Sequence, residues 1–258
     1  MDSFFEAAQA FLWRCWTTLG VAGVSRPFVD LLVDPEGLLV LTGIALDDAR
    51  LSAEVVDWSA RCFGYVSVSR LKNIMRSLTP AERARVYELT AQVNAAAPAR
   101  WPTGEVEATD VVRLSGKSRL PSLASPALAH LRYRALFGTT SRAEILLCLQ
   151  RQRGARTAAE IAQITAYAKR IVARTLEELT QGGIVVATQN GNRLNYDGAF
   201  DWIFWARVIG ACEATRAAKA SVRRIELIRV LNELGQDESQ ILGDRQLADA
   251  FIKAAQHP

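Results

Sequence analysis

Residues 141–196 contain a closely spaced series of helix and hairpin signals, which constrains the fold more than any other feature of the chain. Ser141 is a favourable cap residue and precedes an apolar-periodic helix over residues 142–150. Thr157 and Glu160 have the spacing of a capping box, in which each side chain binds the other residue's backbone N–H. The sequence therefore predicts two helices, the second one short, joined by a basic loop.

A longer helix is predicted over residues 167–181, because its apolar residues recur with helical spacing. Gly182-Gly183 ends this helix. Two β-rich runs follow, 184–188 and 193–196, and the Asn190-Gly191 pair between them is typical of a tight hairpin turn. The apolar stripe of the longer helix consists of Val172, Leu176 and Leu179. The predicted order is helix, short helix, turn, longer helix and hairpin.

This order resembles the winged helix-turn-helix domains of bacterial transcription regulators, in the broad MarR-like and ArsR-like sense. The segments that carry the resemblance are 158–162, the turn at 165–166, 172–179 and 183–185. One departure is Ala166, where many relatives have glycine or a small polar residue. The resemblance implies a sequence-specific regulator, a repressor, whose partner is double-stranded DNA.

The longer helix supplies the first candidate DNA contacts. If its apolar stripe faces the core, Lys169, Arg170, Ala173 and Arg174 lie on the opposite face, which such motifs place in the major groove. Arg170 or Arg174 can bind guanine O6 and N7 bidentately. Lys169 and Tyr167 are expected to bind phosphates. The alternative is a solvated helix face whose glutamates pair with the neighbouring cations.

The basic loop and the hairpin tip supply further candidates. Residues 113–156 contain nine lysines and arginines but only one acidic residue, Glu144. Such a concentration of positive charge suits a polyanion, although it also occurs on faces that merely aid solubility. The loop candidates are Arg151, Arg153 and Arg156, with Thr157 beside them. The hairpin-tip candidates are Gln189, Asn190, Asn192 and Arg193.

The predicted fold is mainly α, with four parts. Residues 1–98 form a helical N-terminal domain, 99–138 a proline-punctuated linker or extended arm, 139–198 the winged unit, and 199–258 a C-terminal helical segment. In the N-terminal domain, helices are expected to begin at or next to Ser3, Pro35, Asp48, Ser67 and Thr79, the last with Glu82 as a second capping box.

The helix that Ser67 caps is expected to bury Leu71, Ile74 and Met75. Its cations Arg70, Lys72 and Arg76 are then expected to be exposed. The N-terminal segment also resembles the helical parts of AbiEi-type antitoxins, although no residue role is transferred from them. This second resemblance implies a protein partner for the N-terminal domain. An antitoxin-like interaction module therefore remains the alternative to a DNA-binding regulator.

Several function classes are disfavoured by residues that the chain lacks. Its only histidines are His130 and His257. The chain also contains neither G-x-x-x-x-G-K-[ST] nor G-x-G-x-x-G, the two common glycine-rich motifs of nucleotide-binding loops. The cysteines Cys15, Cys62 and Cys148, with Cys212, are far apart and form no C-x-x-C pair, which suggests reduced thiols. We therefore expect a cytoplasmic protein that is not an enzyme, has no metal or cofactor and does not span a membrane.

The C-terminal segment offers two interpretations. Residues 200–205 are rich in tryptophan and phenylalanine, which suits either a partner surface or docking on the winged unit. The apolar stripe downstream is a candidate homodimer interface, although it can also pack within its own chain. That stripe consists of Ile225, Ile228, Leu231 and Leu234. A homodimer is expected because DNA-binding domains that place a helix in the major groove commonly act in pairs, one at each half-site.

Overall fold

The computed structural model describes residues 2–23, 31–45, 48–108, 113–151 and 154–198. This part of the chain is mainly helical, with one small antiparallel sheet, as the sequence predicts. It forms two units, each with its own apolar core. The expected C-terminal helices, the aromatic run at 200–205 and the candidate dimer stripe lie outside the described residues.

The N-terminal unit contains five α-helices among its described residues. They are α1 (Asp2–Leu19), α2 (Pro35–Ala45), α3 (Ala49–Cys62), α4 (Val68–Met75) and α5 (Pro80–Ala96). A 3₁₀ turn, η1 (Phe63–Tyr65), follows α3.

The caps of these helices follow the local sequence. Ser67 caps α4, and Thr79 forms the expected capping box with Glu82 at α5. The core centres on Trp16 and Trp58, whose rings meet edge to face with centroids 5.4 Å apart.

The predicted linker is packed rather than free. Asn94 donates to Trp101 O and accepts from Trp101 N, both at 2.9 Å, and Trp101 is buried. Arg119 N donates to Gly20 O at 3.0 Å, and a Cβ on Gly20 would lie only 1.8 Å from Arg119 O. Asp57 accepts from two further backbone amides of this segment. The segment is therefore an arm fastened to the N-terminal unit.

The end of the same segment contains a helix that the sequence analysis missed. A 3₁₀ turn, η2 (Pro126–Leu128), leads into α6 (Ala129–Phe137). This helix buries His130 and Arg134 along with its apolar residues. The buried face of α6 is therefore not a continuous apolar stripe, so hydrophobic periodicity alone could not detect this helix.

The second unit has the predicted winged order. After α6 the chain forms α7 (Ser141–Arg151), β1 (Arg156–Thr157), α8 (Ala158–Thr165), α9 (Lys169–Gln181), β2 (Val185–Asn190) and β3 (Arg193–Gly198). The strand order is β1-β3-β2, and both pairs are antiparallel. The sequence predicted the hairpin but not the two-residue strand β1. It also predicted a start for α9 two residues too early.

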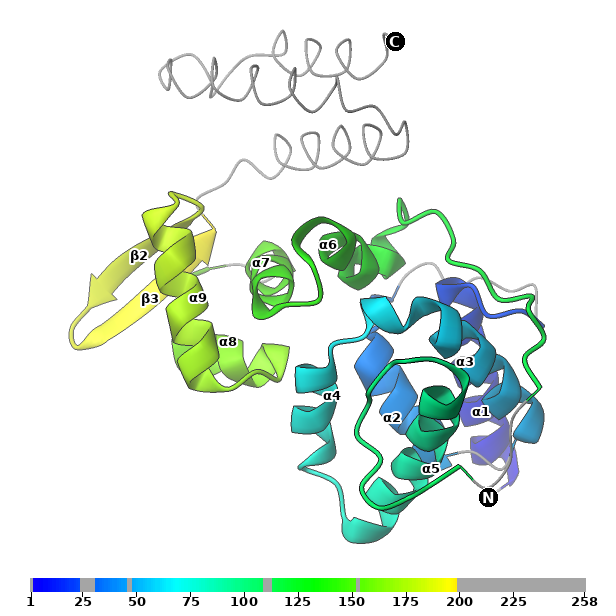
Figure 1. The fold of residues 1–258 in the computed structure, drawn as a ribbon. Helices are drawn as coiled ribbons and strands as arrows, with labels where there is room; N and C mark the ends of the chain where they lie inside the picture. Colours follow the sequence, from blue (N-terminus) through cyan, green and yellow to red (C-terminus); the bar gives the residue numbers. More distant parts are fainter. Residues whose placement is uncertain (1, 24–30, 46–47, 109–112, 152–153, 199–258) are drawn as a thin grey trace, which may run out of the picture.

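The two units meet where α4 lies beside α8, with α6 and α7 above this contact in the view of Figure 1. The core of the winged unit includes Ile145 on α7, Ile161 on α8 and Leu176 on α9, all with 0% exposure. Within the ranges that the structure describes, no helix is both long enough and apolar enough to cross a membrane.

Candidate nucleic-acid interface

Interactions between residues close in sequence define both ends of α8, the short helix before the turn to α9. Thr157 N and Thr157 Oγ1 both donate to Glu160 Oε2 at 2.8 Å, and Glu160 N donates to Thr157 Oγ1 at 3.3 Å. Ala166 then adopts a left-handed conformation with φ of 55°, which ends α8. Alanine is strained at positive φ, a conformation that glycine adopts at lower cost. Thr157 was a candidate DNA contact, but its hydroxyl is used as a helix cap.

The two faces of α9 differ as the sequence predicts. Val172, Leu176 and Leu179 are buried in the core. On the opposite side Lys169, Arg170 and Arg174 are exposed and Ala173 is half-buried. The N-cap residue of α9 is Ala168, which has no side-chain oxygen to cap the first backbone N–H groups. The start of α9 therefore combines two cationic side chains with the positive end of a helix dipole, an arrangement that suits phosphate.

Arg174 lies in an exposed chain of charges. Its Nε donates to Glu178 Oε1 at 3.1 Å, and Arg142 Nη2 donates to Glu178 Oε2 at 3.0 Å. The Arg174 side chain is nevertheless 82% exposed. Exposed ion pairs contribute little to protein stability, so Arg174 can exchange Glu178 for another partner at small cost.

The hairpin tip presents polar side chains. Gln189, Asn190, Asn192 and Arg193 are all exposed, and Asn190 is paired with Arg193 across the hairpin. Gly191 has a φ of 59°, which the tight turn requires. The tip therefore has the amide and guanidinium donors that could bind a DNA backbone or the edge of a minor groove.

The candidates of the basic loop are divided by the structure. Arg151 is exposed at the end of α7, whereas Arg153 lies outside the described residues. Arg156 is part of β1, is half-buried and lies 3.8 Å from Glu160, measured from Nη1 to Oε1. Of the three, Arg151 is the one that the structure places in the open.

Tyr167 is the clearest correction among the candidates. It is only 7% exposed, and its hydroxyl lies 2.7 Å from Ser67 Oγ, across the boundary between the two units. Burial raises the pKa of this hydroxyl. Tyr167 therefore packs against α4 and is not available to bind phosphate in this conformation.

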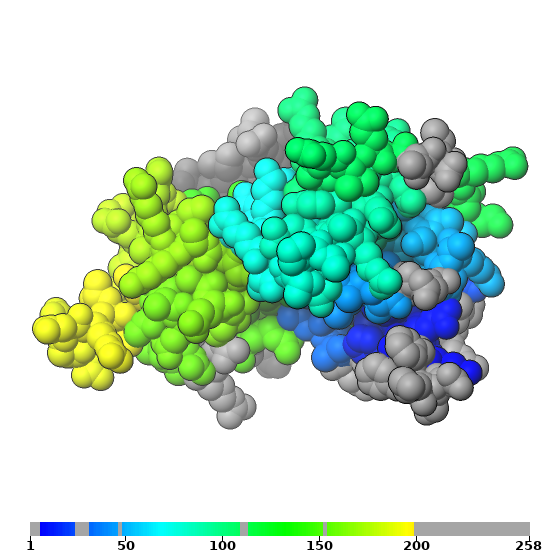
Figure 2. All heavy atoms as spheres, turned by 90° about the horizontal axis from the view of Figure 1, so that it is seen from below, coloured from blue at the N-terminus to red at the C-terminus, as the bar shows by residue number. Residues whose placement is uncertain are grey.

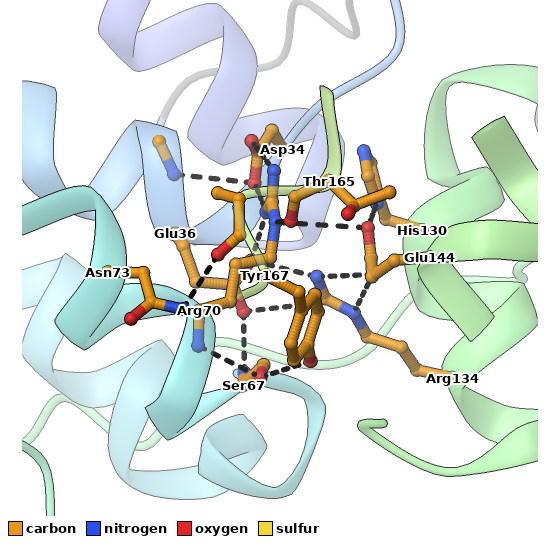
Figure 3. A network of polar contacts seen from close by, with 12 residues as sticks. Asp34, Glu36, Ser67, Arg70, Asn73, His130, Arg134, Glu144, Thr165 and Tyr167 are labelled. Atoms are coloured by element: carbon orange, nitrogen blue, oxygen red, sulfur yellow. Dashed lines mark hydrogen bonds and ion pairs between the residues drawn. The ribbon is translucent and has the colours of Figure 1, made fainter. Parts of the chain in front are cut away.

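A buried network of charges joins the two units, and the sequence analysis missed it. Glu36 on α2 is fully buried and lies between two arginines, with Oε2 2.6 Å from Arg70 Nη1 and Oε1 2.7 Å from Arg134 Nη1. Arg134 also binds Glu144 Oε1 at 2.7 Å. Figure 3 shows these side chains converging from both units.

Arg70 was expected to be exposed, but it is 5% exposed and directed into this network. It is paired with Asp34 as well as Glu36, and its Nε donates to Thr165 O at 2.8 Å. Asn73, one turn further along α4, donates to Ala166 O at 2.9 Å. The two side chains thus bind the backbone of the turn that precedes α9.

Pairing with cationic side chains lowers the pKa of two carboxyl groups in the network. Burial alone would raise the pKa of Glu144, but the hydrogen bond from His130 and the charges of Arg134 and Arg70 lower it to about 2. His130 Nδ1 lies 2.9 Å from Glu144 Oε2. Burial likewise opposes ionisation of Asp34, but its pKa is lowered by the hydrogen bond and charge of Arg70. Both carboxylates are therefore held in the charged form at neutral pH.

The network explains part of the basic charge that the sequence shows. Arg134 belongs to the positive run 113–156, but its charge is neutralised by Glu36 and Glu144. No sequence signal pairs Glu36 with Arg134, which are 98 positions apart. A charged residue on the inward face of a predicted helix is the one local hint, and it does not identify the partner.

Within the described ranges, no group of three or more histidine, cysteine, aspartate or glutamate side chains has an arrangement that could hold a metal ion. No protein-family model, curated protein or solved structure matches the chain.

Proposed function

We propose that this protein is a sequence-specific, double-stranded DNA-binding regulator that acts as a repressor without a cofactor. The observation that carries the proposal is the exposed face of α9, where Lys169 and Arg170 occupy the first turn of a helix that follows a short helix and a tight turn. This is the arrangement in which a recognition helix enters a major groove. In this proposal the protein works in the cytoplasm, together with its DNA.

Different residues would have different roles at the DNA. Arg170, which lies in the first turn of α9, would bind a guanine edge bidentately, with Arg174 as the second candidate after it leaves Glu178. Lys169, Arg151 and the hairpin tip would bind phosphates and hold the register of the helix. Specificity would thus depend on α9, and general affinity on its surroundings.

A homodimer is part of the proposal. One recognition helix and one wing offer little surface compared with the area that specific regulators bury on DNA. Two copies would bind half-sites about one helical turn apart. The apolar stripe at residues 225–234, outside the described residues, is the candidate interface.

A protein partner is the second candidate, and exposed apolar residues of the winged unit favour it. These residues are Ile164, Ile171, Val186 and Leu194, each between 44% and 51% exposed. If the chain is an antitoxin-like interaction module, its protein partner or a second copy of the chain could cover them. The cations on α9 favour DNA over this alternative, since an apolar interface would have to desolvate them.

The test is selection of a preferred duplex from a random pool, followed by titration at several salt concentrations. Binding to DNA should weaken steeply with salt because counterions are released. The Arg170→Ala, Arg174→Ala double variant should lose preference for the selected duplex, at about 1 to 3 kcal/mol for each lost base contact.

The matched control is the Arg113→Ala, Lys117→Ala double variant, which removes two exposed charges from the arm. It should keep the sequence preference of the wild type. A folded α9 variant with unchanged preference would remove α9 from the reading role. A wild-type protein that selects no sequence and shows no salt-dependent binding would exclude the regulator.

A further inference from the structure

α4 is held against the start of the recognition helix by three side chains. Ser67 contacts the Tyr167 hydroxyl, Arg70 donates to Thr165 O, and Asn73 donates to Ala166 O. These contacts bind three consecutive residues, the ones that lead into α9. The position of α4 is therefore fixed relative to the surface that the proposed function assigns to DNA.

The exposed side of α4 is basic. Lys72 and Arg76 are both exposed and lie one helical turn apart. Arg76 Nη1 donates to Asn73 Oδ1 at 3.1 Å, and the same Asn73 side chain donates to Ala166 O. Two hydrogen bonds in series thus connect the Arg76 guanidinium to the turn before α9.

A hollow of about 240 Å³ lies between α4 and α5 beside these cations. It is lined by Lys72, Met75, Arg76, Arg83, Tyr87 and Pro102. Three of the six are cationic and none is acidic. Arg83 is fixed in place, because its Nε donates to Met75 O at 3.1 Å and its Nη2 to Leu78 O at 2.9 Å. The hollow is therefore a positively charged depression in which backbone carbonyls hold one of the three cations.

Figure 2 shows the surface of residues around 68–90 adjoining the surface of residues around 155–175 on one face of the molecule. A helix in a major groove has a phosphate backbone along each side, and elements next to it meet these phosphates. The basic side of α4 lies close to the turn that precedes α9, since Asn73 binds Ala166 O and also accepts from Arg76.

We propose that Lys72 and Arg76, with the hollow beside them, bind backbone phosphates that flank the DNA segment read by α9. This inference rests on the proposed function and extends the DNA contact from the winged unit to the N-terminal unit. Both side chains donate hydrogen bonds to phosphate oxygens, and neither would read base identity from this position. The N-terminal unit would then add affinity but no sequence preference.

The experiment compares two double variants with the wild type on a random-sequence duplex several helical turns long. The Lys72→Ala, Arg76→Ala variant should lower the slope of log binding constant against log salt by up to about 1.8 for each bound copy of the chain, at about 0.9 for each lost phosphate contact. Its preference for a selected sequence over a scrambled one should be unchanged. The Arg113→Ala, Lys117→Ala variant has the same charge change on the arm, away from the winged unit in Figure 1, and should keep the wild-type slope.

A second measurement tests the position of the contact. Trimming the selected duplex at the end that flanks α4 should weaken the wild type and leave the Lys72→Ala, Arg76→Ala variant unaffected, so that the two proteins bind the trimmed duplex equally. Equal slopes for this variant and the wild type would overturn the inference while leaving the proposed function in place. Equal losses in both double variants would show a general charge effect and would also overturn it. A wild-type protein that binds no duplex would overturn both proposals.

Discussion

Arg134 and Arg170 are the same kind of side chain in opposite surroundings. Arg134 is 3% exposed and lies between Glu36 and Glu144, whereas Arg170 is exposed at the start of α9. The first joins the N-terminal unit to the winged unit, and the second is directed to solvent. Basic residues of the described part therefore fall into two sets, a buried set that is paired with carboxylates and an exposed set for which DNA binding is proposed.

The largest expected effect comes from removing the charge of the shared carboxylate in the buried set. Glu36→Gln removes the fully buried negative charge between Arg70 and Arg134, and leaves Asp34 and Glu144 as the remaining acidic partners of the two arginines. Breaking a buried ion pair in this way costs about 3 to 5 kcal/mol of stability. Urea unfolding measures the loss. The control is Glu178→Gln, which removes an exposed carboxylate and should cost less than about 1 kcal/mol. Equal losses in the two variants would break the distinction between buried and exposed pairing.

A pH titration sharpens the same comparison. The pKa of Glu144 is lowered to about 2 in the folded protein from its usual 4.5, so the unfolded chain binds more protons between these values. The stability due to Glu144 is therefore complete above about pH 4.5 and is lost as pH falls toward 2, on the order of 3 kcal/mol. Unfolding free energies of the wild type and Glu144→Gln across this range measure it. The variant should show the shallower dependence, and parallel curves would contradict the pairing.

Substitution of an exposed arginine should have the opposite pattern, with a small effect on stability and a large effect on DNA binding. Arg170→Ala is expected to change the unfolding free energy by less than about 0.5 kcal/mol, since the side chain is exposed at the surface of α9. The same variant should lose about 1 to 3 kcal/mol of discrimination between a selected and a scrambled duplex. Unfolding and binding are measured on one preparation. A large loss of stability would move Arg170 into the structural set.

The division between what the sequence predicted and what it missed follows the range of the interactions. The capping boxes at Thr79 and Thr157, the α9 stripe and the β2–β3 hairpin all depend on residues a few positions apart. They were predicted correctly. Tyr167 was assigned to DNA and Arg70 to solvent, because their partners lie far away in the chain. Ser67, for example, is 100 positions from Tyr167. Periodicity reports which face is apolar but not which polar side chains find a partner inside.

Arg174 lies between the two sets, and the smallest effect is expected there. Its ion pair with Glu178 is exposed and shared with Arg142, so it should contribute little to folding. The Glu178 carboxylate nevertheless competes with DNA for Arg174 and repels phosphate. Glu178→Gln should therefore strengthen binding several-fold at low salt, with the gain shrinking as salt screens the charges. Glu88→Gln, on the exposed face of α5, is the control and should leave affinity unchanged. If Glu178→Gln weakened binding instead, the carboxylate would be positioning Arg174 for the DNA, and Arg174 would belong with the arginines that depend on an acidic partner.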